Sequence, residues 1–295
     1  MERPLAQDLR ALLKIITDQG GTFLVLGRTD VGKSTLIQNL VRLVTARGQA
    51  VAVLDADLGQ STYGLPTTLT LVHFSPEIEP PAPEFVARVF VGATSPVGHL
   101  LQMLVGCRRL LDRAQQLGVR SIFIDTTGLV EGPLAIEFKL QKIDLLQPTH
   151  LLALARAAEL DPIVRACVRR EDLQIHRLPV AAAARERSAE ERRANRQDKY
   201  RRYFTGLVRH RFQLDRLGVW GRLPQRPTET LAGLLVGLND AQGFCLGVGL
   251  LQDYTQNLVE VLTPLLPVEK VRLLRFGTVA LDARGNERFF SSREW

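Results

Sequence analysis

The sequence predicts an α/β protein with a doubly wound, mostly parallel sheet, an arginine-rich helical lid and a small β-rich C-terminal domain. Apolar runs of strand length alternate with helical segments as far as residue 154. A polar stretch over residues 185–204 then carries eight basic and four acidic side chains. Short apolar runs separated by turn residues follow Phe204. We therefore expect a first domain over residues 1–215, with the lid at about 185–204, and a second over 216–295.

The strands of the first domain are expected to be buried, because they read as continuous apolar runs rather than alternating ones. The helices carry apolar residues three and four positions apart. The predicted elements are a helix over residues 9–17, a strand over 22–26, a helix over 34–47, strands over 50–54 and 85–91, a helix over 99–117, a strand over 121–124, a helix over 134–146 and a strand over 149–154. This alternation implies right-handed crossovers, so ligands should bind at the carboxyl ends of the strands.

The C-terminal residues predict a different architecture. Apolar runs over residues 231–238, 244–251, 258–262 and 271–281 have strand length. Turn-forming residues at 239–243 and 282–285 suit hairpin loops between them. These features predict a small, mainly antiparallel domain.

Composition narrows the class of protein. At 295 residues and 45% hydrophobic, the chain can bury one large core and a smaller second one. The net charge of +7 indicates a polyanionic partner, although an arginine bias from genome composition explains it equally well. Cys107, Cys167 and Cys245 are too scattered for a disulfide framework or a zinc site. No segment resembles a leader or a membrane span, so we expect a cytoplasmic protein without membrane contact.

Residues 27–35 satisfy the pattern G-x-x-x-x-G-K-[ST] between a predicted strand and a predicted helix. Glycines in such a loop let successive backbone N–H groups turn inward around phosphates, and the lysine adds a positive charge. The next hydroxyl can ligate Mg²⁺ at the helix start. We therefore predict a site for a nucleoside triphosphate, ATP or GTP, with Mg²⁺. Its residues are Gly27, Arg28, Thr29, Asp30, Val31, Gly32, Lys33, Ser34 and Thr35.

Acidic residues follow two of the predicted strands. Asp55 and Asp57 end the strand after the phosphate loop, and Asp125 ends the strand over residues 121–124. One carboxylate of the first pair can hold Mg²⁺, while the other accepts a proton from an attacking hydroxyl. Asp125 is expected at the metal beside Ser34, and the Thr127 hydroxyl near the γ-phosphate.

These motifs are compatible with two classes of function. A nucleotide-dependent switch or assembly ATPase or GTPase needs the phosphate loop and the Asp125 motif. A kinase needs in addition a base for an alcohol and arginines over the transferring phosphoryl group. Asp57 and the lid arginines Arg187, Arg192 and Arg196 favour the kinase.

The residues resemble a known family, the polynucleotide 5′-hydroxyl kinases. That family includes the RNA kinase subunit of mRNA cleavage and tRNA splicing machinery, the pre-ribosomal RNA kinases and shorter prokaryotic relatives. The resemblance rests on the extended phosphate loop over residues 27–35, on Asp55-x-Asp-x-Gly-Gln60, on Val91-Gly-Ala-Thr-Ser-Pro96 and on an arginine lid that ends at Tyr203-Phe204.

The resemblance implies transfer of a γ-phosphate to the 5′-hydroxyl end of RNA, with DNA as the other acceptor. It implies that Asp57 is the general base and that Lys33, Arg187 and Arg192 stabilise the transferring group. Gln60 matches a residue that orients the phosphate or the acceptor. Leu129 stands where many relatives have a tryptophan, so Tyr63 is a candidate to stack on a base, with Thr127 and Arg196 as further acceptor contacts. The alternative, a switch or assembly ATPase or GTPase, would act on a protein partner, and the sequence leaves the identity of any protein partner open.

Overall fold

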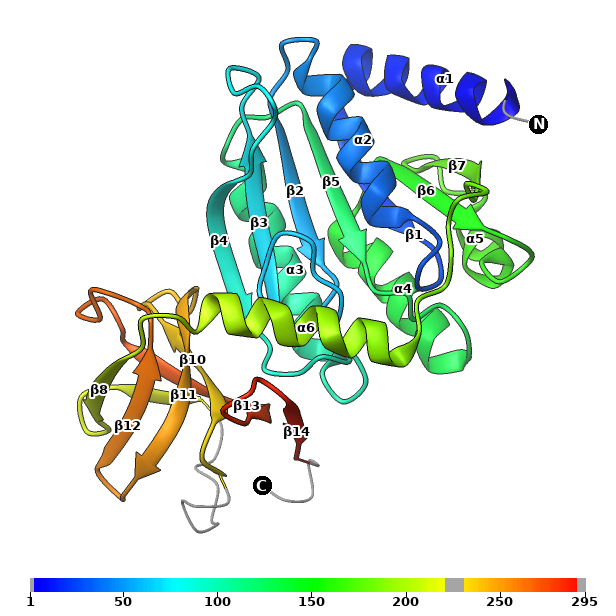
Figure 1. The fold of residues 1–295 in the computed structure, drawn as a ribbon. Helices are drawn as coiled ribbons and strands as arrows, with labels where there is room; N and C mark the ends of the chain where they lie inside the picture. Colours follow the sequence, from blue (N-terminus) through cyan, green and yellow to red (C-terminus); the bar gives the residue numbers. More distant parts are fainter. Residues whose placement is uncertain (1–2, 221–230, 291–295) are drawn as a thin grey trace. The chain divides into compact units, whose positions relative to one another are not determined.

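The computed structural model of the chain describes residues 3–220 and 231–290. It forms two compact units (Figure 1). The first unit comprises the residues up to Asp57, Thr70–Val86 and Leu100–Ser188, and the second comprises Leu58–Leu69, Ala87–His99 and the residues from Ala189 onward.

The first sheet has seven strands in the order β4-β3-β2-β5-β1-β6-β7. Its strands are β1 (Gly21–Leu26), β2 (Val51–Ala56), β3 (Thr68–Phe74), β4 (Glu84–Phe90), β5 (Ser121–Thr126), β6 (His150–Ala155) and β7 (Gln174–Pro179). Strands β2, β5, β1, β6 and β7 run parallel, whereas β3 is antiparallel to β2. The predicted mostly parallel sheet is confirmed.

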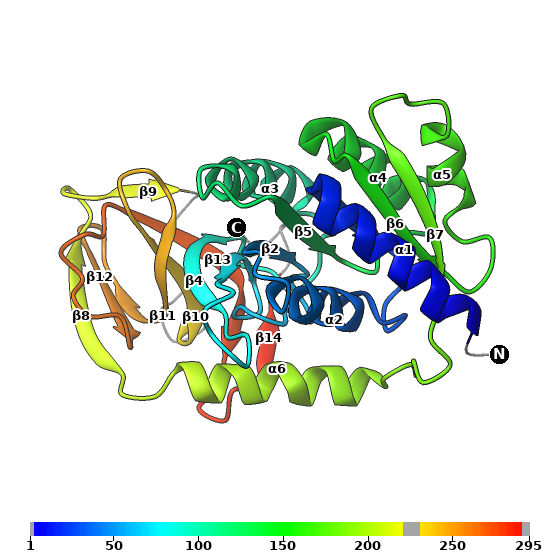
Figure 2. The ribbon, with the colours of Figure 1, turned by 90° about the horizontal axis from the view of Figure 1, so that it is seen from above.

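Helices cover both faces of this sheet, as a doubly wound fold requires. They are α1 (Arg3–Gln19), α2 (Lys33–Thr45), α3 (Leu100–Gln115), α4 (Pro133–Leu146) and α5 (Asp161–Cys167). Helix α1 contacts α2, while α4 contacts both α3 and α5. Figure 2 shows these two groups on opposite sides of the strands. The central strands are therefore buried on both faces, and all six residues of β2 and of β5 are buried.

The second unit contains helix α6 (Ala189–Tyr203) and a separate, mainly antiparallel sheet. The sheet order is β14-β13-β10-β11-β12-β8, and β9 pairs in parallel with β13. Its strands are β8 (Val208–Gln213), β9 (Gly218–Trp220), β10 (Leu234–Asn239), β11 (Cys245–Tyr254), β12 (Leu258–Thr263), β13 (Leu273–Leu281) and β14 (Glu287–Phe289). The expected turns at 239–243 and 282–285 connect antiparallel pairs.

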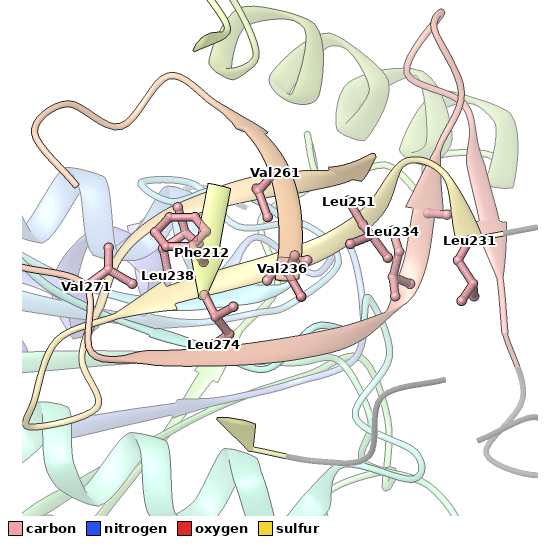
Figure 3. Close-up of a cluster of buried hydrophobic side chains, with 11 residues drawn as sticks. Phe212, Leu231, Leu234, Val236, Leu238, Leu251, Val261, Val271 and Leu274 are labelled. Atoms are coloured by element: carbon pink, nitrogen blue, oxygen red, sulfur yellow. The ribbon is translucent and has the colours of Figure 1, made fainter. Parts of the chain in front are cut away.

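Two apolar clusters hold the second unit together. One is built mainly from this sheet and includes Phe212, Leu234, Val236 and Leu274 (Figure 3). The other joins Leu65 and Phe90, from the two short segments of this unit, to Tyr200 and strand residues such as Val248. Close approach makes Phe90 part of this core, because a Cβ on Gly237 would lie 2.6 Å from its ring.

The compact units do not follow the expected boundary between residues 215 and 216. Strand β8 pairs with β12 along its whole length and so belongs to the second sheet. Helix α6 and the segments around Leu65 and Phe90 also belong to the second unit, because their apolar side chains are buried in its core. Within the described ranges, no helix combines the length and apolar character needed to cross a bilayer.

Candidate active site

The phosphate loop lies between β1 and α2 and has the backbone geometry that its two glycines permit. A Cβ on Gly27 would lie 2.6 Å from the Leu154 carbonyl oxygen, so no larger residue fits there. Gly32 caps α2 with φ of 93°, a left-handed conformation that favours glycine. The buried Lys33 reaches back along the loop, and its Nζ donates a hydrogen bond to the Arg28 carbonyl 2.7 Å away. The expected strand, loop and helix are therefore all present.

The two predicted acidic strand ends lie side by side. Asp55 of β2 and Asp125 of β5 are register partners on adjacent parallel strands, and both are buried. Asp57 follows the end of β2, and its backbone N–H donates to Asp55 Oδ1 at 3.2 Å. Asp57 is only partly buried. The edge of the sheet thus presents two buried carboxylates and a third that is more accessible.

Asp125 is joined to the start of α2. Ser34 Oγ donates to Asp125 Oδ2 at 2.5 Å. The other oxygen, Oδ1, is buried and has no hydrogen-bond partner among the described residues. Burial and the neighbouring Asp55 raise the pKa of Asp125 to about 7, although Lys33 and the Ser34 hydrogen bond act in the opposite direction.

The donor set at this edge fits Mg²⁺. A buried carboxylate oxygen without a partner is costly unless a cation or a water completes its environment. Ser34, Asp55 and Asp125 supply the hydroxyl and carboxylate oxygens that this hard cation prefers. These are the three residues that the sequence predicted for the metal.

The residues after Asp125 contact β1, the phosphate loop and α4. Thr126 Oγ1 donates to the Val25 carbonyl of β1 at 2.7 Å. A Cβ on Gly128 would lie 2.2 Å from the Thr29 backbone nitrogen, so Gly128 contacts the phosphate loop directly. The buried Thr127 has both its carbonyl and its hydroxyl near Lys139 of α4. Sequence patterns do not predict a role for Lys139, because a lysine in a largely apolar helix gives no indication of the direction in which its side chain points.

The first lid arginine contacts the phosphate loop. Arg187 donates to Asp30 through its backbone N–H at 3.0 Å and through Nε at 2.8 Å, and its Nη2 lies 2.7 Å from Asp30 Oδ1. The Asp30 side chain is almost fully buried. Asp30 has φ of 62°, a conformation that aspartate and asparagine tolerate better than most residues. The structure therefore brings Arg187 to the phosphate loop.

Gln60, Tyr63, Arg192 and Arg196 lie in the second unit. Gln60 Nε2 donates to the Arg192 carbonyl at 3.3 Å, while Tyr63 is a partly buried loop residue. Arg196 makes a two-pronged ion pair with Glu287 of β14, with both N···O distances at 2.7 Å. The predicted roles of these four residues, and of Thr127, in acceptor binding or catalysis stay predictions.

Comparison with known proteins identifies similar chains. Residues 27–206 match the model of the family described as mRNA cleavage and polyadenylation factor CLP1 P-loop. The chain is 31% identical to a polyribonucleotide 5′-hydroxyl-kinase of Pyrococcus furiosus, over 92% of this chain and 90% of that one. It is 28% identical to the enzyme of the same name from Methanocaldococcus jannaschii, over 90% and 88%. It is 25% identical to the polyribonucleotide 5′-hydroxyl-kinase Clp1 of Xenopus tropicalis, over 97% and 65%.

The fold is also similar to that of a solved structure. The Clp1p chain in a complex with Pcf11p superposes with a TM-score of 0.71, over 95% of this chain and 79% of that one. The two sequences are only 11% identical in this alignment. The similarity therefore supports the fold.

Proposed function

Because the chain belongs to the CLP1 P-loop family, we propose that it is a polynucleotide 5′-hydroxyl kinase, an enzyme that transfers the γ-phosphate of a nucleoside triphosphate to the 5′-hydroxyl end of RNA. Relatives that align over most of their own length carry the name polyribonucleotide 5′-hydroxyl-kinase. Membership of this family also implies that the chain binds a nucleotide through its phosphate loop.

The observation that carries the proposal is the arrangement of three carboxylates that differ in burial. Asp55 and Asp125 are buried partners on adjacent strands, and Asp125 is hydrogen-bonded to Ser34. Asp57 lies two residues after Asp55 and is more accessible to solvent than the other two carboxylates. Two carboxylates can therefore serve a metal while a third serves as the base that an alcohol nucleophile needs.

In the proposed reaction, Asp57 accepts the proton of the 5′-hydroxyl as its oxygen attacks the γ-phosphorus. The bond from that phosphorus to the β–γ bridging oxygen breaks, and a nucleoside diphosphate leaves. Lys33 contacts the phosphates, while Arg187 and Arg192 offset the charge on the transferring oxygens. Bound Mg²⁺, held through Ser34, Asp55 and Asp125, would neutralise phosphate charge. Gly27, Gly32 and the loop between them supply backbone N–H groups.

RNA is the proposed acceptor because the curated relatives are named for a polyribonucleotide substrate. The net charge of +7 suits a polyanion. Gln60, Tyr63, Thr127 and Arg196 are proposed acceptor contacts. Because Nε and Nη2 of Arg196 are bonded to Glu287, Arg196 would contact the acceptor through the rest of its guanidinium. ATP is the proposed donor, with GTP as the alternative.

The test is to measure triphosphate consumption and label transfer together. Wild-type protein with Mg²⁺ and γ-labelled ATP or GTP is incubated with 5′-hydroxyl RNA, with DNA of the same sequence, and without acceptor. A matched RNA that already carries a 5′-phosphate is the control. The proposal predicts label on the 5′-hydroxyl RNA and little hydrolysis without it. Hydrolysis that is independent of acceptor, with no labelled RNA or DNA, would instead identify a switch or assembly ATPase or GTPase.

A further inference from the structure

Helix α4 carries two lysines that are fully buried, Lys139 and Lys142. A buried ammonium is costly unless hydrogen bonds or opposite charges compensate it. The two lysines differ in this respect. Lys139 has three oxygen atoms around its Nζ. Lys142 Nζ has no hydrogen-bond partner in the described part of the chain and lies 4.6 Å from the centroid of the Phe138 ring.

All three oxygens around Lys139 belong to the two residues that follow Asp125. Nζ lies 2.7 Å from the Thr127 carbonyl oxygen, 3.0 Å from Thr126 Oγ1 and 3.4 Å from Thr127 Oγ1. An ammonium group has three N–H donors, which matches this set of acceptors. Lys139 therefore ties α4 to the end of β5 at the point where the strand leaves the sheet.

The bond to the Thr127 carbonyl also fixes the orientation of the next peptide group. The Thr127–Gly128 peptide is trans, so its N–H points in the direction opposite to its C=O. With the carbonyl directed at Lys139, the Gly128 N–H is directed away from that lysine. Gly128 itself lies against Thr29 of the phosphate loop.

We propose that Lys139 is a positioning residue for phosphoryl transfer, which holds Thr127 and Gly128 so that the Gly128 N–H is presented to the γ-phosphate. The inference rests on the kinase function proposed above. Lys139 contacts neither substrate in this arrangement and acts through the strand end. Burial, and then the neighbouring Lys142 and Lys33, lower the pKa of Lys139 well below its usual range.

A matched pair of variants tests this role. Lys139→Met and Lys142→Met each remove a buried amino group from the same helix, three residues apart, but only the first removes hydrogen bonds to the strand end. We expect Lys139→Met to lower kcat at least about tenfold and Lys142→Met to leave it within about twofold, because small errors in position are costly to transfer.

A binding measurement separates positioning from general structural support. ADP lacks a γ-phosphate, so its dissociation constant should be the same in the wild type and in Lys139→Met. A non-hydrolysable ATP analogue should bind Lys139→Met more weakly than it binds the wild type. If Lys139→Met does not fold, Lys139→Gln replaces it, since glutamine shortens the side chain but keeps a hydrogen-bond donor.

The outcomes distinguish this inference from the kinase proposal. A wild type that labels RNA, with a Lys139 variant that has unchanged kcat or that weakens ADP and the ATP analogue equally, overturns the positioning role alone. A wild type that labels no acceptor overturns the kinase proposal, and the ratio of analogue to ADP affinity still decides whether Lys139 serves the γ-phosphate.

Discussion

Asp30 and Arg187 are 157 residues apart in sequence, yet they link the phosphate loop to the start of the lid segment. The carboxylate of Asp30 accepts from the backbone N–H and from the guanidinium of Arg187. A charge-assisted pair of this kind fixes the plane of the guanidinium as well as its position. Asp30 therefore helps to fix the orientation of the Arg187 guanidinium.

Asp30→Asn should reduce activity by releasing Arg187. Asparagine tolerates the left-handed backbone at this position but carries no charge. We expect kcat to fall about tenfold, a small part of what a transition-state arginine can supply. Arg187→Ala should cost less in the Asp30→Asn background than in the wild type, as steady-state kinetics of the double-mutant cycle would measure.

Asp172→Asn is the matched control for this experiment. Asp172 also accepts from one arginine through two nitrogens, since Arg170 Nε and Nη2 lie 3.1 and 2.7 Å away, but this pair lies on the surface. Loss of the Arg170–Asp172 pair should leave kcat unchanged. Equal costs of Arg187→Ala with and without Asp30→Asn would contradict the coupling.

Sequence patterns predict some of these residues and not others. The phosphate loop, Asp55, Asp57 and Asp125 could be found because each follows a continuous apolar run, and strand ends of a parallel sheet collect ligands. Lys139 and the pairing of Asp30 with Arg187 could not. The contacts of Lys139 join a helix to the preceding strand end, and those of Arg187 reach a loop 157 residues away. Nothing local in the sequence distinguishes these side chains from solvent-exposed charges.

At the scale of elements, the ion pair between Arg196 of α6 and Glu287 of β14 connects the lid helix to the second sheet. The Glu287 side chain is 2% exposed and that of Arg196 is 15% exposed. Removing one partner of such a pair leaves the other charge buried, which typically costs about 3–5 kcal/mol. The pair therefore fixes how α6 lies within the second unit.

Glu287→Ala should lower stability far more than the loss of a surface pair on the same helix. The control is Asp198→Ala, which breaks the exposed i,i+4 pair with Arg202. We expect urea unfolding followed by circular dichroism to show a loss of about 3 kcal/mol for Glu287→Ala and at most about 0.5 kcal/mol for Asp198→Ala. Equal midpoints for the two variants would show that the Glu287 pair does not support α6.

The elements that the sequence predicted share strong apolar character, and those it missed do not. Strand β3 was missed because Thr68 and Thr70 alternate with its leucines, although both threonines are fully buried. Strands β7 and β8 end their sheets and carry charged side chains such as Arg177 and Arg211. Edge strands are often charged, and this hides them from a search for apolar runs.

At the scale of the whole molecule, the chain enters the second unit three times. The two earlier segments contribute Leu65 and Phe90 to a core whose other members come from α6 and the second sheet. A linear division into successive domains cannot describe this arrangement. Local periodicity also gives no information on which distant strands enclose a given side chain, so the sequence could not predict it.

A fragment of residues 1–215 should therefore expose apolar surface and be less stable than the full chain. It retains Leu65, Phe90 and Tyr200 but lacks partners such as Leu235, Val248 and Val279. We expect it to bind a hydrophobic dye and to unfold at a lower temperature than the full chain, which is the control. A fragment that unfolds cooperatively at the temperature of the full chain would contradict this.

The most direct test of the kinase proposal is transfer of label from γ-labelled triphosphate to 5′-hydroxyl RNA by the wild type and by Asp57→Asn. The wild type is predicted to place one phosphatase-sensitive label on each RNA 5′ end. Loss of the general base should slow Asp57→Asn by about 100-fold or more, with ADP affinity unchanged. Absence of label with the wild type, or equal rates for the two proteins, would contradict the assignment of Asp57 as the base in transfer to RNA.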